Sequence, residues 1–272
     1  MQPGSDTRRR ANVLGVGVDA IDLPAAVERL LGAVDAGERG YVCVTGVHGV
    51  MEAQRDPEMM RILNGSLLTT PDGMPMVWVG RAQGHRRMAR VYGPDLMLAL
   101  CGRTAATGHT HFLYGGAPGV AEELERRLVA RFPGLRIVGT YTPPFRPLSA
   151  AEEAELAARV AAVRPDFFWV GLSTPKQERF MARYQGRLET RIMLGVGAAF
   201  DMHSGRVKQA PRWMQRSGLE WFYRLCQEPR RLYRRYLTNN PKFVYLIALQ
   251  AAGLLERPLG PAMPEAGRGG SA

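Results

Sequence analysis

The chain has 272 residues, of which 46% are hydrophobic and 22% are charged, so one large domain, or a domain with an appendage, can bury a sizeable core. The net charge of +11 favours a polyanionic partner, namely nucleic acid, an anionic bilayer or a phosphorylated substrate. The three cysteines are far apart in apolar contexts, which excludes a disulfide framework and zinc spacing. Neither a signal peptide nor an apolar run of the ~20 residues that cross a bilayer is found, so we expect a soluble or surface-attached protein.

Apolar runs alternate with segments of helical period along the first two thirds of the chain. We predict strands at 13–18, 41–45, 67–70, 111–114, 136–139, 166–171 and 191–196. We predict helices at 23–34, 50–63, 94–104, 120–132, 151–163 and 175–185, and a further helix that begins after Gly73. Strands that are apolar throughout and alternate with helices are typical of a parallel sheet covered on both faces. The predicted fold is therefore α/β and Rossmann-like, with a mostly parallel sheet.

The composition changes after residue 205. Between residues 206 and 242 arginines are frequent, and only Glu220 and Glu228 oppose them. As a helix, 230–237 would separate its arginines from its Leu and Tyr side chains, and Pro241 could open a second, apolar helix over 242–255. This pattern suits the surface of an anionic bilayer. We therefore divide the chain into a disordered N-terminus (1–11), an α/β catalytic domain (12–205), a basic amphipathic helical appendage (206–256) for membrane association and active-site closure, and a disordered tail (257–272).

Polar residues follow several predicted strands, where the sites of parallel sheets form. Asp72 follows the strand 67–70 in Pro71-Asp72-Gly73, although a turn or helix-capping aspartate is the alternative. The segment 173–178 offers hydroxyl, amide and ammonium donors, although Thr174 and Pro175 also read as an ordinary helix start. Asp201 follows the strand 191–196.

A glycine-rich turn, 115–119, joins a predicted strand to a predicted helix. Such turns can bring backbone N–H groups to a phosphate or nucleotide. The turn is neither the dinucleotide fingerprint nor a P-loop, and a tight turn without a ligand is an equal alternative. The sequence contains no D-x-D motif and no cluster of acids and histidines with metal-ligand spacing, so we expect no metal and no cofactor.

Four segments together resemble one known family. The segment GVGAAFDMHSGRVKQAPRWMQRSGLEWFYRLCQEPRRLYRRYLTNNPKF (195–243) is similar to the C-terminal signature of the WecG/TagA/CpsF glycosyltransferases, glycosyltransferase family 26. The segments PDGMPMVW (71–78), RVYGPDLM (90–97) and GLSTPKQE (171–178) are similar to its other motifs, in the same order. The resemblance covers roughly residues 12 to 250.

The resemblance implies an inverting, metal-independent glycosyltransferase. It would move a hexose or N-acetylhexosamine from a UDP-sugar onto a polyprenyl-diphosphate-linked saccharide in cell-envelope or exopolysaccharide biosynthesis. The implied partners are the UDP-sugar donor, the polyprenyl-diphosphate-linked acceptor and an anionic membrane surface, without nucleic acid. The implied location is cytoplasmic, peripheral at the inner face of the cell membrane, and a homo-oligomer is compatible with the sequence.

The same resemblance assigns roles to residues. The family's proposed general base falls on Asp72. A family asparagine that helps to hold the acceptor aligns with Gly46, which has no side chain. The acceptor contact beside Arg90 is therefore either lost or taken over by Thr45 or His48. For UDP binding, the resemblance indicates Gln177 and appendage arginines among Arg224, Arg231 and Arg234. The residues that follow the predicted strands add Gly115, Gly116, Thr174, Lys176 and Asp201 to the expected UDP site.

The expected chemistry follows from these parts. One carboxylate can accept the proton of an attacking hydroxyl, and fixed arginines can stabilise the charge that develops on a leaving diphosphate. A basic nucleic-acid-binding α/β protein is one alternative, although no nucleic-acid-binding motif accompanies the arginines. A nucleotide-binding oxidoreductase is another, although the glycine fingerprint that it would use is absent.

Overall fold

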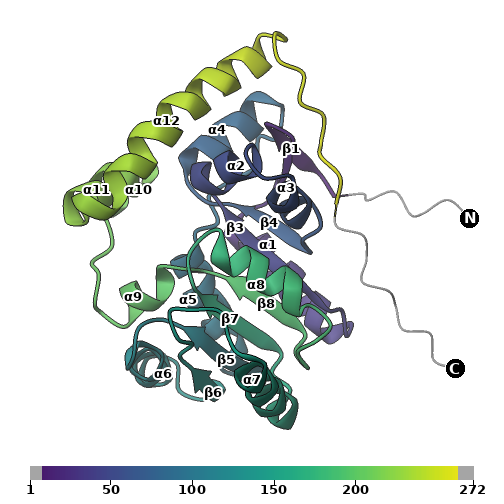
Figure 1. Ribbon diagram of the computed structural model, residues 1–272, viewed down its shortest axis with the longest axis vertical. Helices are drawn as coiled ribbons and strands as arrows, with labels where there is room; N and C mark the ends of the chain where they lie inside the picture. Colours follow the sequence, from purple (N-terminus) through teal and green to yellow (C-terminus); the bar gives the residue numbers. More distant parts are fainter. Residues whose placement is uncertain (1–7, 263–272) are drawn as a thin grey trace, which may run out of the picture.

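The apolar runs of the sequence form a six-stranded parallel sheet in the order β4-β3-β8-β7-β5-β6 (Figure 1). The computed structural model describes residues 8–262. The strands are β3 (Gly40–Thr45), β4 (Leu68–Pro71), β5 (Thr110–Gly115), β6 (Arg136–Tyr141), β7 (Phe167–Gly171) and β8 (Ile192–Gly195). Each corresponds to a predicted strand, and the predicted Rossmann-like α/β architecture is confirmed.

Helices cover both faces of this sheet. They are α1 (Leu23–Asp35), α2 (Val47–Ala53), α3 (Pro57–Asn64), α4 (Met74–Ala82), α5 (Gly93–Thr104), α6 (Val120–Arg131), α7 (Ala150–Val163), α8 (Lys176–Tyr184) and α9 (Ala199–His203). Successive strand residues point to opposite faces, so Phe168 belongs to a hydrophobic cluster with residues of α2, α7 and α8, whereas Trp169 belongs to a second cluster with residues of α1, α5 and α6. Burial on both faces explains why the strands are apolar throughout.

The first predicted strand is a hairpin. β1 (Arg10–Val13) and β2 (Val16–Asp19) pair antiparallel outside the main sheet. The two residues between them, Leu14 and Gly15, have φ of 54° and 86°, as a type I′ turn requires. The prediction of one strand over 13–18 is therefore wrong. The hairpin begins at Arg10, within the predicted disordered N-terminus, of which residues 1–7 lie outside the described residues.

The predicted helix 50–63 is two helices, α2 and α3. Asp56 separates the two helices, because its side chain accepts a hydrogen bond from the Glu58 N–H (2.9 Å) and so caps the N-terminus of α3. Pro57, as the first residue of α3, has no N–H to bond to the preceding turn.

The appendage folds back over one end of the sheet as α10 (Arg212–Arg216), α11 (Glu220–Gln227) and α12 (Pro229–Ala251) (Figure 1). The expected break at Pro241 is wrong, since α12 runs through it. A proline inside a helix costs about 3 kcal/mol. Asn239 and Phe243 are buried on either side of Pro241, and Phe243 belongs to the same hydrophobic cluster as α2 and α8, so packing offsets this cost. The side chain of Arg231 lies outside the described part of the structure.

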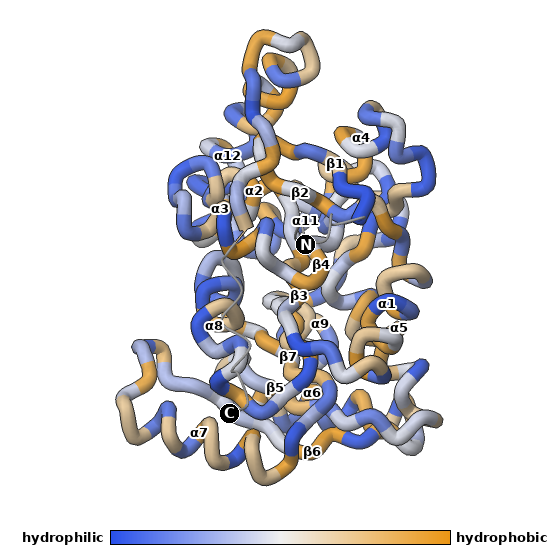
Figure 2. Tube along the Cα trace, turned by 90° about the vertical axis from the view of Figure 1, so that its right-hand side faces the viewer, coloured by the Kyte–Doolittle hydropathy of each residue, from blue (hydrophilic) through white to orange (hydrophobic). Residues whose placement is uncertain are grey.

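The chain beyond α12 returns to the β1–β2 hairpin. The Gly260 N–H donates to the Gly15 carbonyl (2.8 Å), and Asn12 donates to the Arg257 carbonyl (2.7 Å). Part of the segment predicted as a disordered tail thus has a defined place, and its remainder, 263–272, lies outside the described residues. Figure 2 shows hydrophobic residues of α4 and α12 at this same end of the molecule.

Candidate active site

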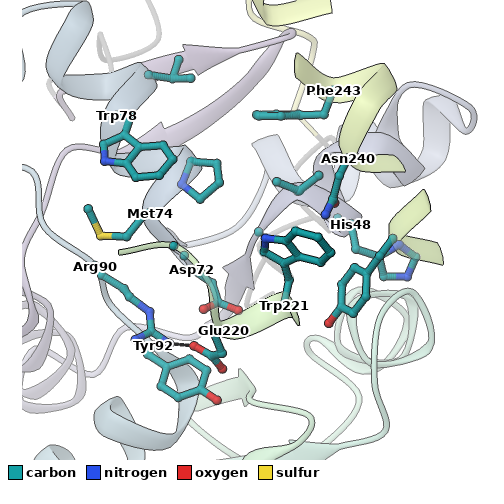
Figure 3. Close-up of a pocket in the computed structure, with 18 of the residues that line it drawn as sticks. His48, Asp72, Met74, Trp78, Arg90, Tyr92, Glu220, Trp221, Asn240 and Phe243 are labelled. Carbon is teal, nitrogen blue, oxygen red and sulfur yellow. Dashed lines mark hydrogen bonds and ion pairs between the residues drawn. The ribbon is translucent and has the colours of Figure 1, made fainter. Parts of the chain in front are cut away.

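A cavity of about 1540 Å³ lies where the carboxyl ends of β3, β4, β7 and β8 face the appendage (Figure 3). The loops after these strands contribute Gly46, Asp72, Thr174 and Gly197 to its wall. α11 and α12 contribute the opposite wall, which includes Trp221, Arg224 and Tyr236. The cavity is therefore enclosed only because the appendage folds back over the sheet.

Asp72 is placed by two glycines and one backbone contact. Its N–H donates to the Thr45 carbonyl (2.9 Å), which continues the β3–β4 ladder by one residue. Gly73 follows with φ of 92°, a conformation that favours glycine, and begins α4. A Cβ atom on Gly46 would lie 2.8 Å from the Asp72 carbonyl oxygen, closer than real Cβ contacts. The glycine at 46 thus gives Asp72 the space it occupies.

The carboxyl of Asp72 is a base of unusual strength. Burial raises its pKa to about 6, and the nearby Glu220 carboxylate acts in the same direction. The guanidinium groups of Arg90 and Arg224 oppose this rise. A carboxylate with a pKa close to the working pH combines a usable ionised fraction with a strong pull on a proton.

Arg90 connects this carboxylate to the appendage. Its guanidinium lies 3.9 Å from the ring centroid of Tyr92, and one nitrogen donates to Gln215 Oε1 (2.8 Å). It also forms a largely buried ion pair with Glu220, drawn in Figure 3. Gln215 and Glu220 both belong to the appendage, so Arg90 holds α10 and α11 against the α/β domain.

Several buried polar atoms around the cavity have no hydrogen-bond partner in the described chain. They include Nε of Arg90, Arg224 and Arg235, and Oε1 of Gln177. Leaving such groups unpaired costs about 1–3 kcal/mol each, and more where they are charged. Atoms of this kind in a cavity wall are suited to bind the oxygens and N–H groups of a ligand.

The orientation of Gln177 is set by its neighbour. The buried Glu178 carboxylate accepts hydrogen bonds from Thr174 Oγ1 (2.8 Å) and Gln177 Nε2 (3.1 Å). With its nitrogen engaged there, the amide oxygen of Gln177 faces Gly197, where a Cβ atom would lie 3.3 Å away. Gln177 is thus poised as a hydrogen-bond acceptor at the cavity wall.

His48 lines the cavity in its neutral form. Burial lowers its pKa to about 4, and the charges of Arg235 and Arg55 lower it further. Its Nδ1 lies 3.2 Å from Nδ2 of the buried Asn239, whose Oδ1 accepts a hydrogen bond from Arg55 (2.6 Å). Asn239 therefore joins α12 to α2 beside the cavity.

The structure brings together only part of the predicted site. Of the predicted residues, Asp72, His48, Arg90, Thr174, Gln177 and Arg224 line the cavity, whereas Thr45, Gly115, Gly116, Lys176, Asp201 and Arg234 lie outside its lining. The Thr45 side chain is buried and bonds to the Cys43 carbonyl. Arg234 is exposed and donates to the Tyr233 hydroxyl (2.8 Å). The prediction for Arg231 falls on a side chain outside the described part.

Gly115 and Gly116 serve packing between strand ends. A Cβ atom on Gly115 would lie 2.7 Å from the Gly171 carbonyl oxygen, and one on Gly116 would lie 2.8 Å from Val120. The Gly116 N–H already donates to the Gly171 carbonyl (3.2 Å). This turn therefore matches the alternative interpretation of a tight turn.

The residues of the cavity wall that sequence reasoning missed include Tyr92, Glu220, Trp221 and Arg235. Tyr92 lies within the RVYGPDLM segment, which could have drawn attention to it. The helical pattern over 230–237 places Arg235 on the half that carries the arginines, and its proximity to His48 depends on how α12 packs on α2.

The comparison with known families decides what kind of protein has this cavity. A model of the glycosyl transferase WecG/TagA/CpsF family matches residues 11–257. The chain belongs to this family. It is a glycosyltransferase, as the four sequence segments imply.

Two curated relatives carry the same name, N-acetylglucosaminyldiphosphoundecaprenol N-acetyl-beta-D-mannosaminyltransferase. The relative from Bacillus spizizenii (strain ATCC 23059 / NRRL B-14472 / W23) is 32% identical over 211 residues, which cover 78% of this chain and 79% of that protein. The relative from Bacillus subtilis (strain 168) is 31% identical over 195 residues, covering 72% and 73%.

Residues 8–262 offer neither a membrane-spanning helix nor a metal site built from side chains. No helix in this range combines the length and the apolar character needed to span a bilayer. Within the same range, no group of three or more His, Cys, Asp or Glu side chains is arranged to hold a metal ion.

Proposed function

We propose that this glycosyltransferase moves a hexose or N-acetylhexosamine from a UDP-sugar to a polyprenyl-diphosphate-linked saccharide, with inversion and without a metal. The observation that carries the proposal is the cavity wall itself, in which a buried carboxylate of raised pKa lies near guanidinium groups with unpaired Nε atoms. The names of the two relatives support N-acetylmannosamine as the first sugar to test and an N-acetylglucosaminyl-diphosphate lipid as the first acceptor.

In this proposal Asp72 is the general base. The acceptor hydroxyl attacks the anomeric carbon while its proton passes to the Asp72 carboxylate. The bond from that carbon to the diphosphate oxygen breaks on the opposite side, and UDP leaves with the electron pair. One displacement of this kind inverts the anomeric configuration. A positioned base contributes roughly 10²–10⁴-fold to such a step.

The leaving diphosphate needs positive charge that is already in place. Arg224 and Arg235 come from the appendage, line the cavity and each retain an unpaired buried Nε–H. Guanidinium groups match phosphate oxygens in charge and geometry, and they act most strongly where water is excluded. The sequence has no D-x-D motif, so these arginines take the role that a metal ion would otherwise fill.

The appendage would then have two tasks, closing the site and contacting a membrane. Closure is supported by the contacts of Arg90 with Gln215 and Glu220. Membrane contact is supported by the exposed Trp213 and Phe222, which share the appendage with exposed arginines such as Arg230 and Arg234. We accordingly propose a peripheral position at the cytoplasmic face of the cell membrane, where the lipid-linked acceptor is found.

The test is UDP release by the full chain over a panel of UDP-sugars with an N-acetylglucosaminyl-diphosphate lipid, in EDTA and in MgCl₂. We expect release that depends on the acceptor, equal rates in both buffers, and a product of inverted anomeric configuration by NMR. Release that needs Mg²⁺ would contradict the metal-independent mechanism.

A thermal-shift comparison tests the two alternatives in parallel. UDP should raise the melting temperature of the chain, whereas NAD should leave it unchanged. Retention of a labelled oligonucleotide at physiological salt, with no shift by UDP, would favour the nucleic-acid-binding alternative instead.

A further inference from the structure

The cavity has two ends of different chemistry. Asp72, Arg90 and Glu220 mark the polar end, whereas Trp78 of α4 and Phe243 of α12 lie on the other side of the cavity (Figure 3). At that second end, the wall from α4 and the wall from residues 237–251 of α12 contain no charged side chain.

We call this second end the apolar groove. Its walls are Trp78, Val79 and Ala82 of α4 and Val244, Ala248 and Ala251 of α12. Ala82 is three residues from Val79 and four from Trp78, and Val244, Ala248 and Ala251 recur at spacings of four and three, so each set lies along one face of its helix.

The groove exposes side chains that a folded protein normally covers. Trp78 is 51% exposed and Val244 is 65% exposed, although both face the cavity. Contiguous apolar surface left in water is unfavourable, and where it occurs it commonly marks a binding site. A ligand that covered this groove would bury apolar surface on both walls at once.

The size of the groove favours a long, narrow ligand. From Val244 to Ala251, the α12 wall of the groove extends for about 10 Å at 1.5 Å per residue, and residues that line the cavity continue back along α12 to Leu237. The whole cavity, at about 1540 Å³, exceeds the range of about 300–1,000 Å³ that pockets for small molecules occupy. A UDP-sugar at the polar end would therefore leave the groove available.

We propose that the apolar groove binds the polyprenyl chain of the acceptor, in a subsite separate from that of the donor. The inference rests on the proposed function and names the part of the substrate that the second end of the cavity receives. The acceptor is apolar at its chain, anionic at its diphosphate and hydroxylated at its sugar. The cavity presents apolar walls at one end and, at the other, the Asp72 carboxylate beside guanidinium groups, so both kinds of acceptor surface meet matching chemistry.

Other occupants match the groove less well. A nucleobase would need several hydrogen-bond partners, whereas along α4 and residues 237–251 of α12 the cavity lining offers only Trp78, Asn240 and Tyr245, because Gln250 is already bonded to Leu14 and Asn12. A second copy of the chain would need a protruding apolar segment narrow enough to enter between α4 and α12. A prenyl chain requires neither feature.

The decisive variant fills the groove. Ala248→Trp places a large side chain at an exposed alanine that lines the groove, and Ala252→Trp makes the same change four residues later, outside the lining. Two acceptors are compared, N-acetylglucosaminyl diphosphate carrying either an undecaprenyl chain or a methyl group. The readout is the ratio of kcat/KM for the long-chain acceptor to kcat/KM for the methyl acceptor.

We expect the unmodified chain to prefer the long-chain acceptor and Ala248→Trp to lower the ratio by a factor of about ten, as the loss of a few buried methylenes would. Ala252→Trp should leave the ratio unchanged. An unchanged ratio in Ala248→Trp, or an equal loss with both acceptors in a folded protein, would overturn the proposal.

A second measurement separates this inference from the proposed reaction. A prenyl diphosphate with a benzophenone at its chain end is photolysed with the full chain, and the modified peptides are identified by mass spectrometry. Cross-links to α4 and α12 that Ala248→Trp abolishes would support the groove even if no sugar transfer were detected. Cross-links elsewhere, with sugar transfer intact, would refute the groove and leave the reaction standing.

Discussion

Asp72 lies at the end of β4 with its side chain partly buried, and this position has an energetic cost. Its pKa is about 6 in the folded protein against 3.8 when unperturbed, so the folded state retains a proton that the unfolded chain releases. The cost is absent below pH 3.8, grows as the pH rises and is complete above about pH 6. A residue kept at such a cost is a reasonable candidate for a function other than stability.

The first prediction follows from this cost. Asp72→Asn removes the charge but keeps the shape, so it should raise the free energy of unfolding at pH 8 by up to about 3 kcal/mol. It should also lower the rate of sugar transfer by at least about 100-fold. Urea unfolding at pH 8 and pH 4 measures the first effect, which should vanish at pH 4. Equal stability of the two proteins at pH 8 would show that the raised pKa is wrong.

The second prediction concerns the neighbours of Asp72. If this carboxylate is the base, kcat/KM should rise with pH to a plateau, with a midpoint near pH 6. Glu220→Gln removes a negative charge and should move the midpoint to lower pH. Arg224→Gln removes a positive charge and should move it to higher pH, whatever it does to the maximal rate. Shifts of the same sign in the two variants would rule out Asp72 as the titrating group.

At the scale of elements, local sequence patterns determine most of the fold. The six strands of the main sheet are predictable because strands buried on both faces must be apolar throughout. The predictions of helices and strands fail where one residue changes the chain direction or where tertiary packing outweighs the local sequence preference. Gly15 turns a predicted strand into a hairpin, whereas Pro241 does not end α12 because Asn239 and Phe243 are buried around it.

The site is less predictable than the fold, for a topological reason. Residues that follow β4 and β7 could be proposed because strand ends form sites. The sequence does not show that β5 lies outside the strands bordering the cavity, and this position explains why Gly115 and Gly116 are absent from its wall. The contributions of Glu220 and Arg235 depend on how α10–α12 fold back, which no local pattern records.

The third prediction tests the attachment of α12. Asn239 bonds to His48 of α2 and to Arg55, which follows α2, and it is only 4% exposed. Asn239→Ala removes both hydrogen bonds between α12 and this part of the α/β domain and should weaken the docking of α12 by about 1–3 kcal/mol, although Arg55 keeps its ion pair with Glu52. We expect faster amide hydrogen exchange across 229–251 and a lower kcat, because Arg235 is less well held.

Thr238→Ala, a change at the exposed neighbouring position, is the matched control and should alter neither measurement. If Asn239→Ala showed native exchange in α12 and a lower kcat, then Asn239 would act on the reaction by a route other than docking.

At the scale of the whole molecule, positive charge and exposed aromatic side chains gather at one end. Trp213, Phe222 and Tyr245 are exposed on the appendage, which also carries many of the arginines. The loop after β6 lies at the opposite end of the molecule from α12 (Figure 1). It also exposes an aromatic residue, Phe145, and so provides a natural comparison.

The fourth prediction is selective binding to anionic membranes through the appendage. Each basic side chain near such a surface contributes about 1 kcal/mol, and the attraction decays within a Debye length of about 8 Å at physiological salt. The chain should therefore sediment with vesicles of phosphatidylglycerol and phosphatidylcholine, not with phosphatidylcholine alone, and added salt should weaken the binding. Insertion of apolar side chains into the bilayer adds a contribution to the binding free energy that salt does not screen.

Trp213→Ser should reduce the vesicle binding that remains at high salt, because the Trp213 side chain is 63% exposed on the basic appendage. Phe145→Ser removes an aromatic side chain that is 89% exposed at the other end of the molecule, so it should leave vesicle binding unchanged. If both substitutions weakened binding equally, the membrane contact would not be confined to the appendage.

If vesicles and an oligonucleotide of the same charge competed equally at physiological salt, the appendage would act as a general polyanion-binding surface. Selective binding to vesicles, by contrast, would place the cavity mouth at the surface from which a lipid-linked acceptor must enter.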